Sequence, residues 1–197
     1  MTPLWSAVGV CFAGYLLGSI PFGVLVARAV RGVDVRAAGS GNIGATNVAR
    51  VVGVGPGLVV LALDAGKGAL AVLSARALLP GAEVAQALTG LCAVLGHIAP
   101  VSLGFRGGKG VATALGVLAV LVPAGALAGV LAYAGVFALF RISSLGSLSA
   151  GTAAVAASAV WPGTRLSVGL TSLLFALILF THRGNIRRLL SRQETRL

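Results

Sequence analysis

The sequence predicts an all-α integral membrane protein with about seven transmembrane helices, some of them short, in one membrane domain that comprises residues 1–197. Of its residues, 57% are hydrophobic and 10% are charged, and the mean hydropathy is +1.01. Soluble domains carry about 25% charged residues, so this composition argues against a soluble protein. The apolar residues also gather in stretches that reach the roughly 20 residues a helix needs to cross a bilayer.

The first apolar span runs from Leu4 to Ala29. It is longer than the apolar region of a signal peptide and lacks a basic start, so we expect it to be retained. Pro21 interrupts its second half and predicts a kink near one membrane interface. An ordinary kink in a membrane helix is enough to explain this proline.

The second span, Gly57–Leu79, carries Asp64 and Lys67. Residues three apart share one face of a helix, and charged groups at this depth are costly unless they are paired or functional. We interpret the two residues first as a structural ion pair and second as part of the wall of a site. The third span runs from Val84 to Leu103 and has His97 toward its end.

The second half of the chain contains four more spans. The apolar stretch Val111–Phe140 is too long for one ordinary helix, and Pro123 near its middle predicts two short helices that turn there. Leu145–Val160 and Leu166–Thr181 are the last two spans. The tail that follows, residues 182–190, is basic and amphipathic, and we expect it to lie on the membrane surface.

A net charge of +11 accompanies this hydropathy. Because long apolar spans separate the cations, anionic lipid headgroups and anionic substrates are better partners than nucleic acid. With seven spans and an external amino terminus, 12 of the 15 basic residues fall on one face, which the positive-inside rule makes cytoplasmic. These residues are Arg28, Arg31, Arg36, Arg50, Arg106, Lys109, Arg141, Arg183, Arg187, Arg188, Arg192 and Arg196.

A loop rich in glycine, serine, asparagine and threonine follows the first span and ends in an arginine. Glycines let backbone N–H groups approach a ligand closely, the polar side chains supply neutral donors, and arginine supplies a fixed positive charge. This chemistry suits a phosphate, and the alternative is a flexible linker between membrane helices. The residues concerned are Gly39, Ser40, Gly41, Asn42, Gly44, Thr46, Asn47 and Arg50.

The three glycines of this loop also match the G-x-G-x-x-G spacing of dinucleotide-binding proteins. That spacing is informative only when it follows a strand and opens the helix of a βαβ unit. Here a membrane-length apolar span and a basic segment precede it, so we reject a dinucleotide-binding fold.

A second glycine-rich basic loop, Gly104–Thr113, surrounds Lys109. It is not a P-loop, because the lysine is followed by glycine and the preceding spacing is wrong. Glycines around one lysine still make a pocket for an anion, lined by backbone N–H groups. The candidate binding residues here are Gly107, Gly108, Lys109, Gly110 and Thr113.

Two anion loops suggest two anionic substrates, or one substrate with two anionic groups. The only two histidines, His97 and His182, fall close to the same face, where each could act as a general base or equally make a structural hydrogen bond. No serine or cysteine has the setting of an activated nucleophile, and with four acids in the chain an acid-rich metal site is not expected. Direct transfer between two bound substrates remains.

Seven short motifs occur in an order that resembles the bacterial acyl-phosphate:glycerol-3-phosphate acyltransferase family, over nearly the whole chain. Each motif alone is weak, but the ordered set is specific. The motifs are Gly18–Gly23, Gly39–Arg50, Asp64-x-x-Lys67-Gly68, Gly96-His97-x-x-Pro100, Phe105–Thr113, Ser143-Ser144 and His182-x-x-Asn185-Ile186-x-Arg188-Leu189.

The resemblance implies a seven-helix fold in the bacterial inner membrane, with the amino terminus outside and with the carboxyl terminus and the active site at the cytoplasmic face. It implies transfer of a fatty acyl group from acyl phosphate to the 1-hydroxyl of glycerol 3-phosphate, which yields lysophosphatidic acid and phosphate. The expected partners are these two substrates and membrane lipids. No nucleic acid, metal or cofactor is expected, and a monomer is compatible with the sequence.

The resemblance also implies roles for residues. Ser40, Arg50, His97, Lys109, His182 and Asn185 form the expected catalytic set; Arg50, Lys109 and Asn185 also bind substrate, together with Ser143 and the remaining polar residues and glycines of the two loops. His97 is expected to orient the lysine loop, and the acceptor of the hydroxyl proton is a histidine or a substrate phosphate. The tail departs from the family's pattern around Glu194, so this residue receives no role.

Two other functions compete with the enzyme. A transporter for a phosphorylated metabolite would suit broken helices and charges within the membrane, but inverted repeats are not evident and the polar groups crowd one face. A purely structural membrane protein would leave both glycine-rich basic loops unexplained. Chemistry that needs both substrates would distinguish the enzyme from a carrier.

Overall fold

The computed structural model describes residues 4–161 and 164–197, and this part of the chain is helical, with no β-strand. It forms two compact units, here called unit 1 and unit 2, with the boundary between Val117 and Leu118. Each unit is described by itself, and the single membrane domain expected from the sequence stays a prediction.

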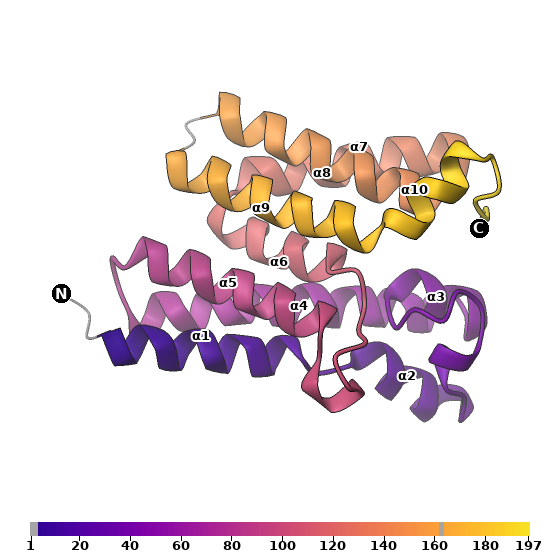
Figure 1. The fold of residues 1–197 in the computed structure, drawn as a ribbon, viewed down its shortest axis with the longest axis horizontal. Coiled ribbons are helices and arrows are strands. Elements are labelled where there is room, and N and C mark those ends of the chain that lie inside the picture. Colours follow the sequence, from indigo (N-terminus) through magenta and orange to yellow (C-terminus); the bar gives the residue numbers. More distant parts are fainter. Residues whose placement is uncertain (1–3, 162–163) are drawn as a thin grey trace. The chain divides into compact units, whose positions relative to one another are not determined.

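Unit 1 contains the first five α-helices, two short 3-10 helices and most of a sixth α-helix (Figure 1). Helices α1, α4 and α5 pack on one another, and α2 and α3 pack against α4. The elements are α1 (Leu4–Gly18), α2 (Phe22–Arg31), η1 (Val35–Ala37), α3 (Ala45–Val51), α4 (Val54–Leu78), α5 (Glu83–Ile98), η2 (Val101–Leu103) and α6 (Val111–Leu121).

Glycines bring the helices of unit 1 into close contact. A methyl group on Gly18 of α1 would collide with the carbonyl of Ala93 in α5. On α4, Gly68 meets the carbonyl of Thr113 in the same way, so α6 lies directly against α4. In a membrane, where the hydrophobic effect does not drive helices together, such small residues let helix backbones approach closely.

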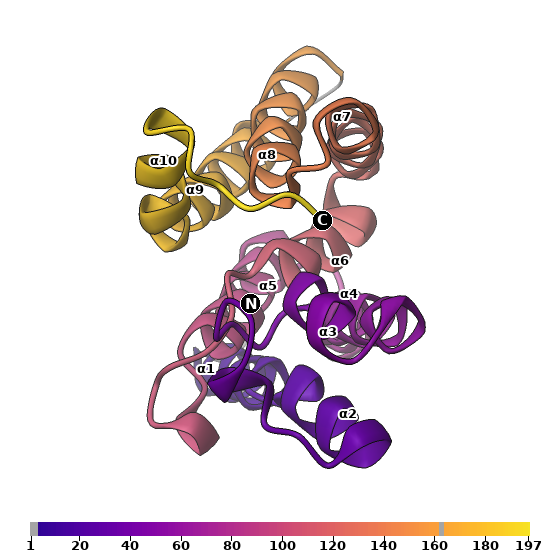
Figure 2. The ribbon, with the colours of Figure 1, turned by 90° about the vertical axis from the view of Figure 1, so that its right-hand side faces the viewer.

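Unit 2 contains α7 (Pro123–Phe140), α8 (Ser143–Val160), α9 (Arg165–Thr181) and α10 (Arg183–Leu190). Helix α8 packs against both α7 and α9, and Figure 2 shows it between them. Gly125 and Gly129 of α7 approach the carbonyls of Ala154 and Ala150 in α8.

Both proline breaks predicted from the sequence are confirmed. The first span divides at Ser19–Pro21, between the end of α1 and the start of α2. The long apolar stretch divides at Val122, and Pro123 is the first residue of α7, a position at which proline costs no hydrogen bond.

By length and composition, four described helical stretches can cross a membrane: residues 4–31, 54–78, 83–103 and 123–140. Helices α9 and α10 meet at a bend of 65° and would make a fifth span if they are counted together. The structure therefore supports a multi-pass membrane protein. The count of seven spans, the orientation of the termini and the placement of α10 on the membrane surface stay predictions.

Candidate active site

The glycine-rich loop of unit 1 is organised by one buried side chain, that of Asn47 at the start of α3. Its Oδ1 accepts a hydrogen bond from the backbone N–H of Ser40 (2.8 Å), and its Nδ2 lies within 2.8–3.1 Å of the carbonyls of Val35, Ala38 and Asn42. Only 1% of Asn47 is exposed. The loop, whose own backbone bonds include that from the N–H of Gly41 to the carbonyl of Ala38, is thus organised around one side-chain amide.

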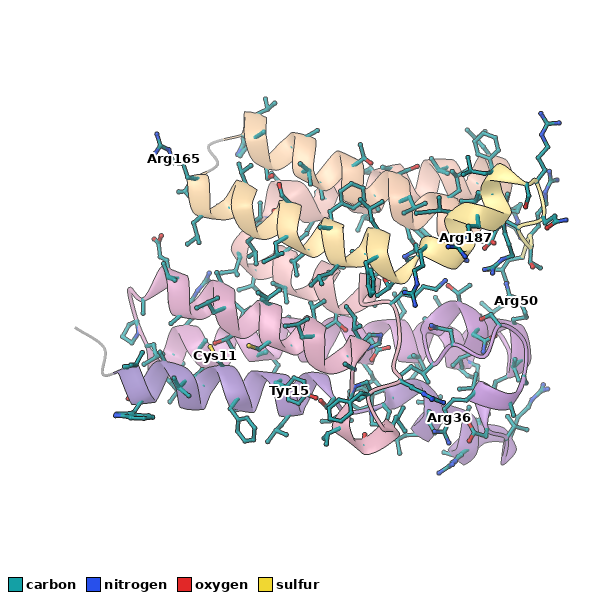
Figure 3. All side chains as sticks on the ribbon, viewed as in Figure 1. Cys11, Tyr15, Arg36, Arg50, Arg165 and Arg187 are labelled. Atoms are coloured by element: carbon teal, nitrogen blue, oxygen red, sulfur yellow. The ribbon has the colours of Figure 1, made fainter. Side chains whose placement is uncertain are left out.

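Other residues of this loop divide between shaping it and facing outward. Asn42 Oδ1 accepts from the N–H of Gly44 (2.9 Å) just before α3 begins, and Gly39 has a φ of 60°, which favours glycine. Ser40 and Arg50 are exposed, and Figure 3 shows Arg50 and Arg36 at the end of unit 1 away from Cys11.

The loop is preceded by an exposed acidic cap. The Asp34 carboxylate accepts hydrogen bonds from the backbone N–H of Arg36 (3.0 Å) and from its guanidinium (2.6 Å), and it pairs with Arg28 at 3.4 Å. Hydrogen bonds from the Arg36 side chain and backbone, followed by the charges of the two arginines, hold the pKa of Asp34 well below its usual range.

The lysine loop lies against the end of α5. The N–H groups of Gly107 and Gly108 donate to the carbonyls of Ile98 and His97, each at 3.0 Å. Gly110 has a φ of 84° and leads into α6. Lys109 between these glycines is half-buried.

Thr113, which the sequence expects to bind substrate, is fully buried in α6. Its backbone carbonyl and its methyl group face Gly68 of α4. This location makes Thr113 part of the contact between two helices, and a binding role for its hydroxyl stays a prediction.

The predicted pair between Asp64 and Lys67 is confirmed. Asp64 Oδ1 lies 2.8 Å from Lys67 Nζ and 3.5 Å from His97 Nδ1, with all three side chains at most 4% exposed. Lys67 Nζ also donates to the carbonyl of Ile20 (2.8 Å) in the first proline break. His97 is therefore in the interior of unit 1, between α4 and the lysine loop.

In unit 2, the polar residues gather around the Glu194 carboxylate. Its Oε1 accepts from Asn185 Nδ2 (2.6 Å) and Ser144 Oγ (2.9 Å), and its Oε2 accepts from Arg188 Nε (2.7 Å). The tail is also tied by the N–H of Leu197, which donates to the carbonyl of Arg141 (2.8 Å).

Burial alone would raise the pKa of Glu194, but the hydrogen bonds from Asn185, Ser144 and Arg188 and the charge of Arg188 lower it below the usual value. No role was assigned to this residue from the sequence. A usable signal was present, because Glu194 is the only acid after Glu83 in a chain with basic residues throughout its tail.

His182 lies at the bend between α9 and α10 and is 2% exposed. Its Nδ1 is 2.9 Å from the carbonyl of Ile178. Because a carbonyl only accepts, the proton is on Nδ1 and the lone pair of the neutral ring is on Nε2. At the start of α8, Ser143 makes a hydrogen bond with the hydroxyl of Tyr133 at 2.9 Å.

The structure thus brings the sequence-predicted residues together in three groups, two in unit 1 and one in unit 2. In unit 1, Asn47 gathers the residues of the loop that ends at Arg50, and His97 contacts the lysine loop. In unit 2, Ser144 and Asn185 share one carboxylate. Among the described residues, no group of three or more histidine, cysteine or acidic side chains could hold a metal ion.

Comparison with known proteins gives one consistent result. A family model described as glycerol-3-phosphate acyltransferase matches residues 8–192. A glycerol-3-phosphate acyltransferase of Myxococcus xanthus is 63% identical over 93% of this chain and 95% of that protein. One of Synechococcus elongatus is 42% identical over 98% of this chain and 96% of that protein.

Solved structures agree with the sequence relatives. The crystal structure of PlsY (YgiH), an integral membrane glycerol 3-phosphate acyltransferase, in its glycerol 3-phosphate form, matches with a TM-score of 0.92 and 42% identity over 98% of this chain and 96% of that one. Its lysophosphatidic acid form matches with a TM-score of 0.90. This chain therefore belongs to the glycerol-3-phosphate acyltransferase family and is an acyltransferase.

Proposed function

We propose that this enzyme transfers a fatty acyl group from acyl phosphate to the 1-hydroxyl of glycerol 3-phosphate, the first acylation in phospholipid synthesis. The observation that carries the acceptor and the product is the relative solved with each of them, glycerol 3-phosphate and lysophosphatidic acid, at 42% identity. The two glycine-rich basic loops support a donor that also carries a phosphate, because each loop suits one phosphate group.

In this reaction the hydroxyl oxygen of glycerol 3-phosphate bonds to the acyl carbon, and the bond from that carbon to the phosphate oxygen breaks. Phosphate leaves with the electron pair, and the hydroxyl proton passes to His182 or to a phosphate oxygen. An acyl phosphate already has a good leaving group, so no enzyme nucleophile is required. Binding and charge stabilisation then supply the catalysis.

We assign the residues by unit. In unit 1, Arg50 and Lys109 bind phosphate oxygens as cations, and Ser40 with the backbone of its loop donates hydrogen bonds. In unit 2, Ser143, His182 and Asn185 bind glycerol 3-phosphate, and Glu194 fixes the amide of Asn185. Asn47 and Asn42 support binding through the shape of their loop, since their amide oxygens accept bonds within it.

The same proposal places the enzyme in the inner membrane with its active site facing the cytoplasm. The cations of the proposed binding loops and of the tail support this orientation, because basic segments are retained on the cytoplasmic side. A monomer is sufficient for the proposed chemistry.

Lys109→Ala tests the proposal. Detergent-purified enzyme given acyl phosphate and glycerol 3-phosphate should release phosphate only when both are present, and the variant should lose about 100-fold in kcat/KM because one cation at the transferring group is gone. Arg106→Ala, which removes an exposed cation three residues earlier, is the matched control and should retain activity. Wild-type turnover by the Lys109 variant, or phosphate release without glycerol 3-phosphate, would contradict the assignment.

A further inference from the structure

We infer that Asp64, Lys67 and His97 form a buried relay that positions the Gly107–Lys109 loop, so that these three are positioning residues for the reaction. The inference rests on the proposed function only in that Lys109 meets a substrate phosphate. The resemblance placed His97 in the catalytic set and also expected it to orient the lysine loop, and its surroundings favour the second role and add Asp64 and Lys67 to it.

The relay begins with two charges in the interior of a membrane span. Asp64 and Lys67 are one helical turn apart on α4, with side chains 2% and 1% exposed and 2.8 Å between Oδ1 and Nζ. Burying two charges is costly, and a buried ion pair is often no more stabilising than apolar residues of the same size. The pair therefore calls for an explanation beyond fold stability.

The lysine end of the relay holds the proline break of the first span. Lys67 Nζ donates to the carbonyl of Ile20 at 2.8 Å and lies 5.5 Å from the centre of the Phe22 ring. The same break contacts the segment after α5, since the hydroxyl of Ser102 lies 3.4 Å from the carbonyl of Ser19. The break is thus joined to the relay at Ile20 and to the segment after α5 at Ser19.

The carboxylate end faces the imidazole. Asp64 Oδ1 is 3.5 Å from His97 Nδ1, and because a carboxylate only accepts, it favours the tautomer with the proton on Nδ1. This separation is that of a charge contact and not of a hydrogen bond, and both atoms are buried. The other ring nitrogen, Nε2, is the atom of His97 that lies nearest to the space beside Gly108.

The loop lies directly on this ring. A methyl group on Gly108 would overlap His97 Nε2, and one on Gly107 would overlap the carbonyl of His97. The loop is also bonded to the carbonyls of His97 and Ile98 through the N–H groups of these two glycines. The ring therefore lies under Gly108, the residue directly before Lys109, and forms the floor of the loop there.

The far side of Lys109 is fixed by the same helix. A methyl group on Gly110 would lie 3.1 Å from Val94 and 3.2 Å from Ile98, both on α5. Lys109 is thus the residue between two glycines that are pressed onto α5. A shift of the His97 ring would move the backbone from which the Lys109 side chain emerges.

The decisive variant replaces the ion pair with apolar residues of similar size, Asp64→Leu with Lys67→Met. Such exchanges are often neutral for stability, so the variant distinguishes an effect on the position of the loop from an effect on the stability of the fold. Hydrogen exchange followed by mass spectrometry should show amides of residues 105–110 exchanging roughly 10-fold faster, with the amides of α4 and α5 unchanged. Unchanged exchange in the loop of a folded variant would overturn the inference.

Gln86→Met is the matched control. It also removes a buried polar group from unit 1, one whose Nε2 donates to the carbonyl of Leu79 at 3.2 Å, but at the opposite end of α5. Loop exchange and activity should both match wild type. If this variant loosens the loop as much as the ion-pair variant does, the effect is general and the relay is refuted.

A second pair of variants tests the ring itself and does not depend on the apolar exchange folding. Gly108→Ala should lower activity and speed loop exchange, because the added methyl group meets the His97 ring. Adding His97→Ala should restore part of the loop protection by opening that space. If the effects of the two substitutions on loop exchange simply add, the ring does not support the loop.

Kinetics then distinguish this inference from the proposed function. The Asp64→Leu/Lys67→Met variant should lose about 10-fold or more in kcat/KM, and it should lose nothing further in a Lys109→Ala background, because the relay acts only through that lysine. Equal losses in both backgrounds would refute the relay. If the loop exchanges faster but the activity is unchanged, the relay is supported and the proposed role of Lys109 is refuted.

Discussion

Two irregular polar segments, the loop of residues 35–50 in unit 1 and the tail of residues 182–197 in unit 2, are each held by one side chain. Asn47 contacts one N–H and three carbonyls of its loop. Glu194 accepts hydrogen bonds from Ser144, Asn185 and Arg188. In both segments, one side chain joins several parts of the segment, in addition to the backbone hydrogen bonds of the short helices η1, α3 and α10.

The difference between them is charge. Asn47 is neutral and 1% exposed, so the geometry of its loop should not depend on pH or salt. The Glu194 side chain is 9% exposed, is ionised, and pairs with an arginine that is 47% exposed. The tail should therefore respond to acid and salt where the loop does not. The loop of unit 1 and the tail of unit 2 therefore differ in their sensitivity to solution conditions.

The largest effect is expected for Asn47→Leu, which keeps the size of the side chain and removes its polar atoms. Each buried polar group left without a partner costs about 1–3 kcal/mol, so the loop should lose its shape. We expect at least about a 100-fold loss of kcat/KM and a lower Tm. Steady-state kinetics and thermal unfolding in detergent measure the two effects.

Arg31→Gln is a control for this prediction, because it changes an exposed side chain just before the same loop. It should behave as wild type. If Asn47→Leu kept most of the activity, then the loop would be held by other contacts and the comparison with Glu194 would fail.

A smaller effect is expected for the tail. Glu194→Ala removes three acceptor contacts and should release residues 191–197, with a loss of about 1–2 kcal/mol for that segment and about a 10-fold lower activity as the amide of Asn185 loses its partner. Glu194→Gln keeps one carbonyl oxygen for Asn185 and Ser144 and should cost less. Limited proteolysis of the tail, with activity assayed in parallel, ranks the two variants.

The pH dependence has a definite sign. The pKa of Glu194 is lowered in the folded protein, so its stabilisation is complete above the usual pKa of about 4.5 and is lost as the pH falls through the folded value. Wild-type tail cleavage should rise in that acidic window, while Glu194→Gln should show no such rise. An identical acid transition in both proteins would show that another group releases the tail.

The sequence was sufficient for features that local patterns determine. Four of the apolar spans, the breaks at Pro21 and Pro123 and the pair between Asp64 and Lys67 follow from segment length, proline stereochemistry and helical spacing. The hydrogen-bond partners of Asn47 and of Glu194 could not be predicted from such local patterns. The bond from Glu194 to Ser144 joins residues 50 apart, and no local pattern records how the tail returns to α8.

His97 illustrates the same limit within unit 1. Its residue type and its position near the end of a span that is expected to be cytoplasmic were compatible with a base or a structural role, and local sequence patterns offered no way to choose. What separates the two roles is the pair of groups the ring faces, Asp64 on one helix and Gly108 in a later loop. Those contacts arise only when three segments pack together.

The smallest effect is expected for Asp34→Asn, at the start of the loop that Asn47 holds. The hydrogen bonds of Arg36 lower the pKa of this carboxyl, so Asp34 stays ionised in acid conditions that release the tail, and its stabilisation is lost only as the pH falls through that low value. Exposed ion pairs contribute little and are screened by salt, and asparagine still offers an oxygen to the N–H of Arg36. Tm and KM for glycerol 3-phosphate should therefore match wild type at low and high salt. A large loss would mean that the loop depends on an exposed charge as well as on its buried amide, and the contrast between the neutral loop and the charged tail would no longer hold.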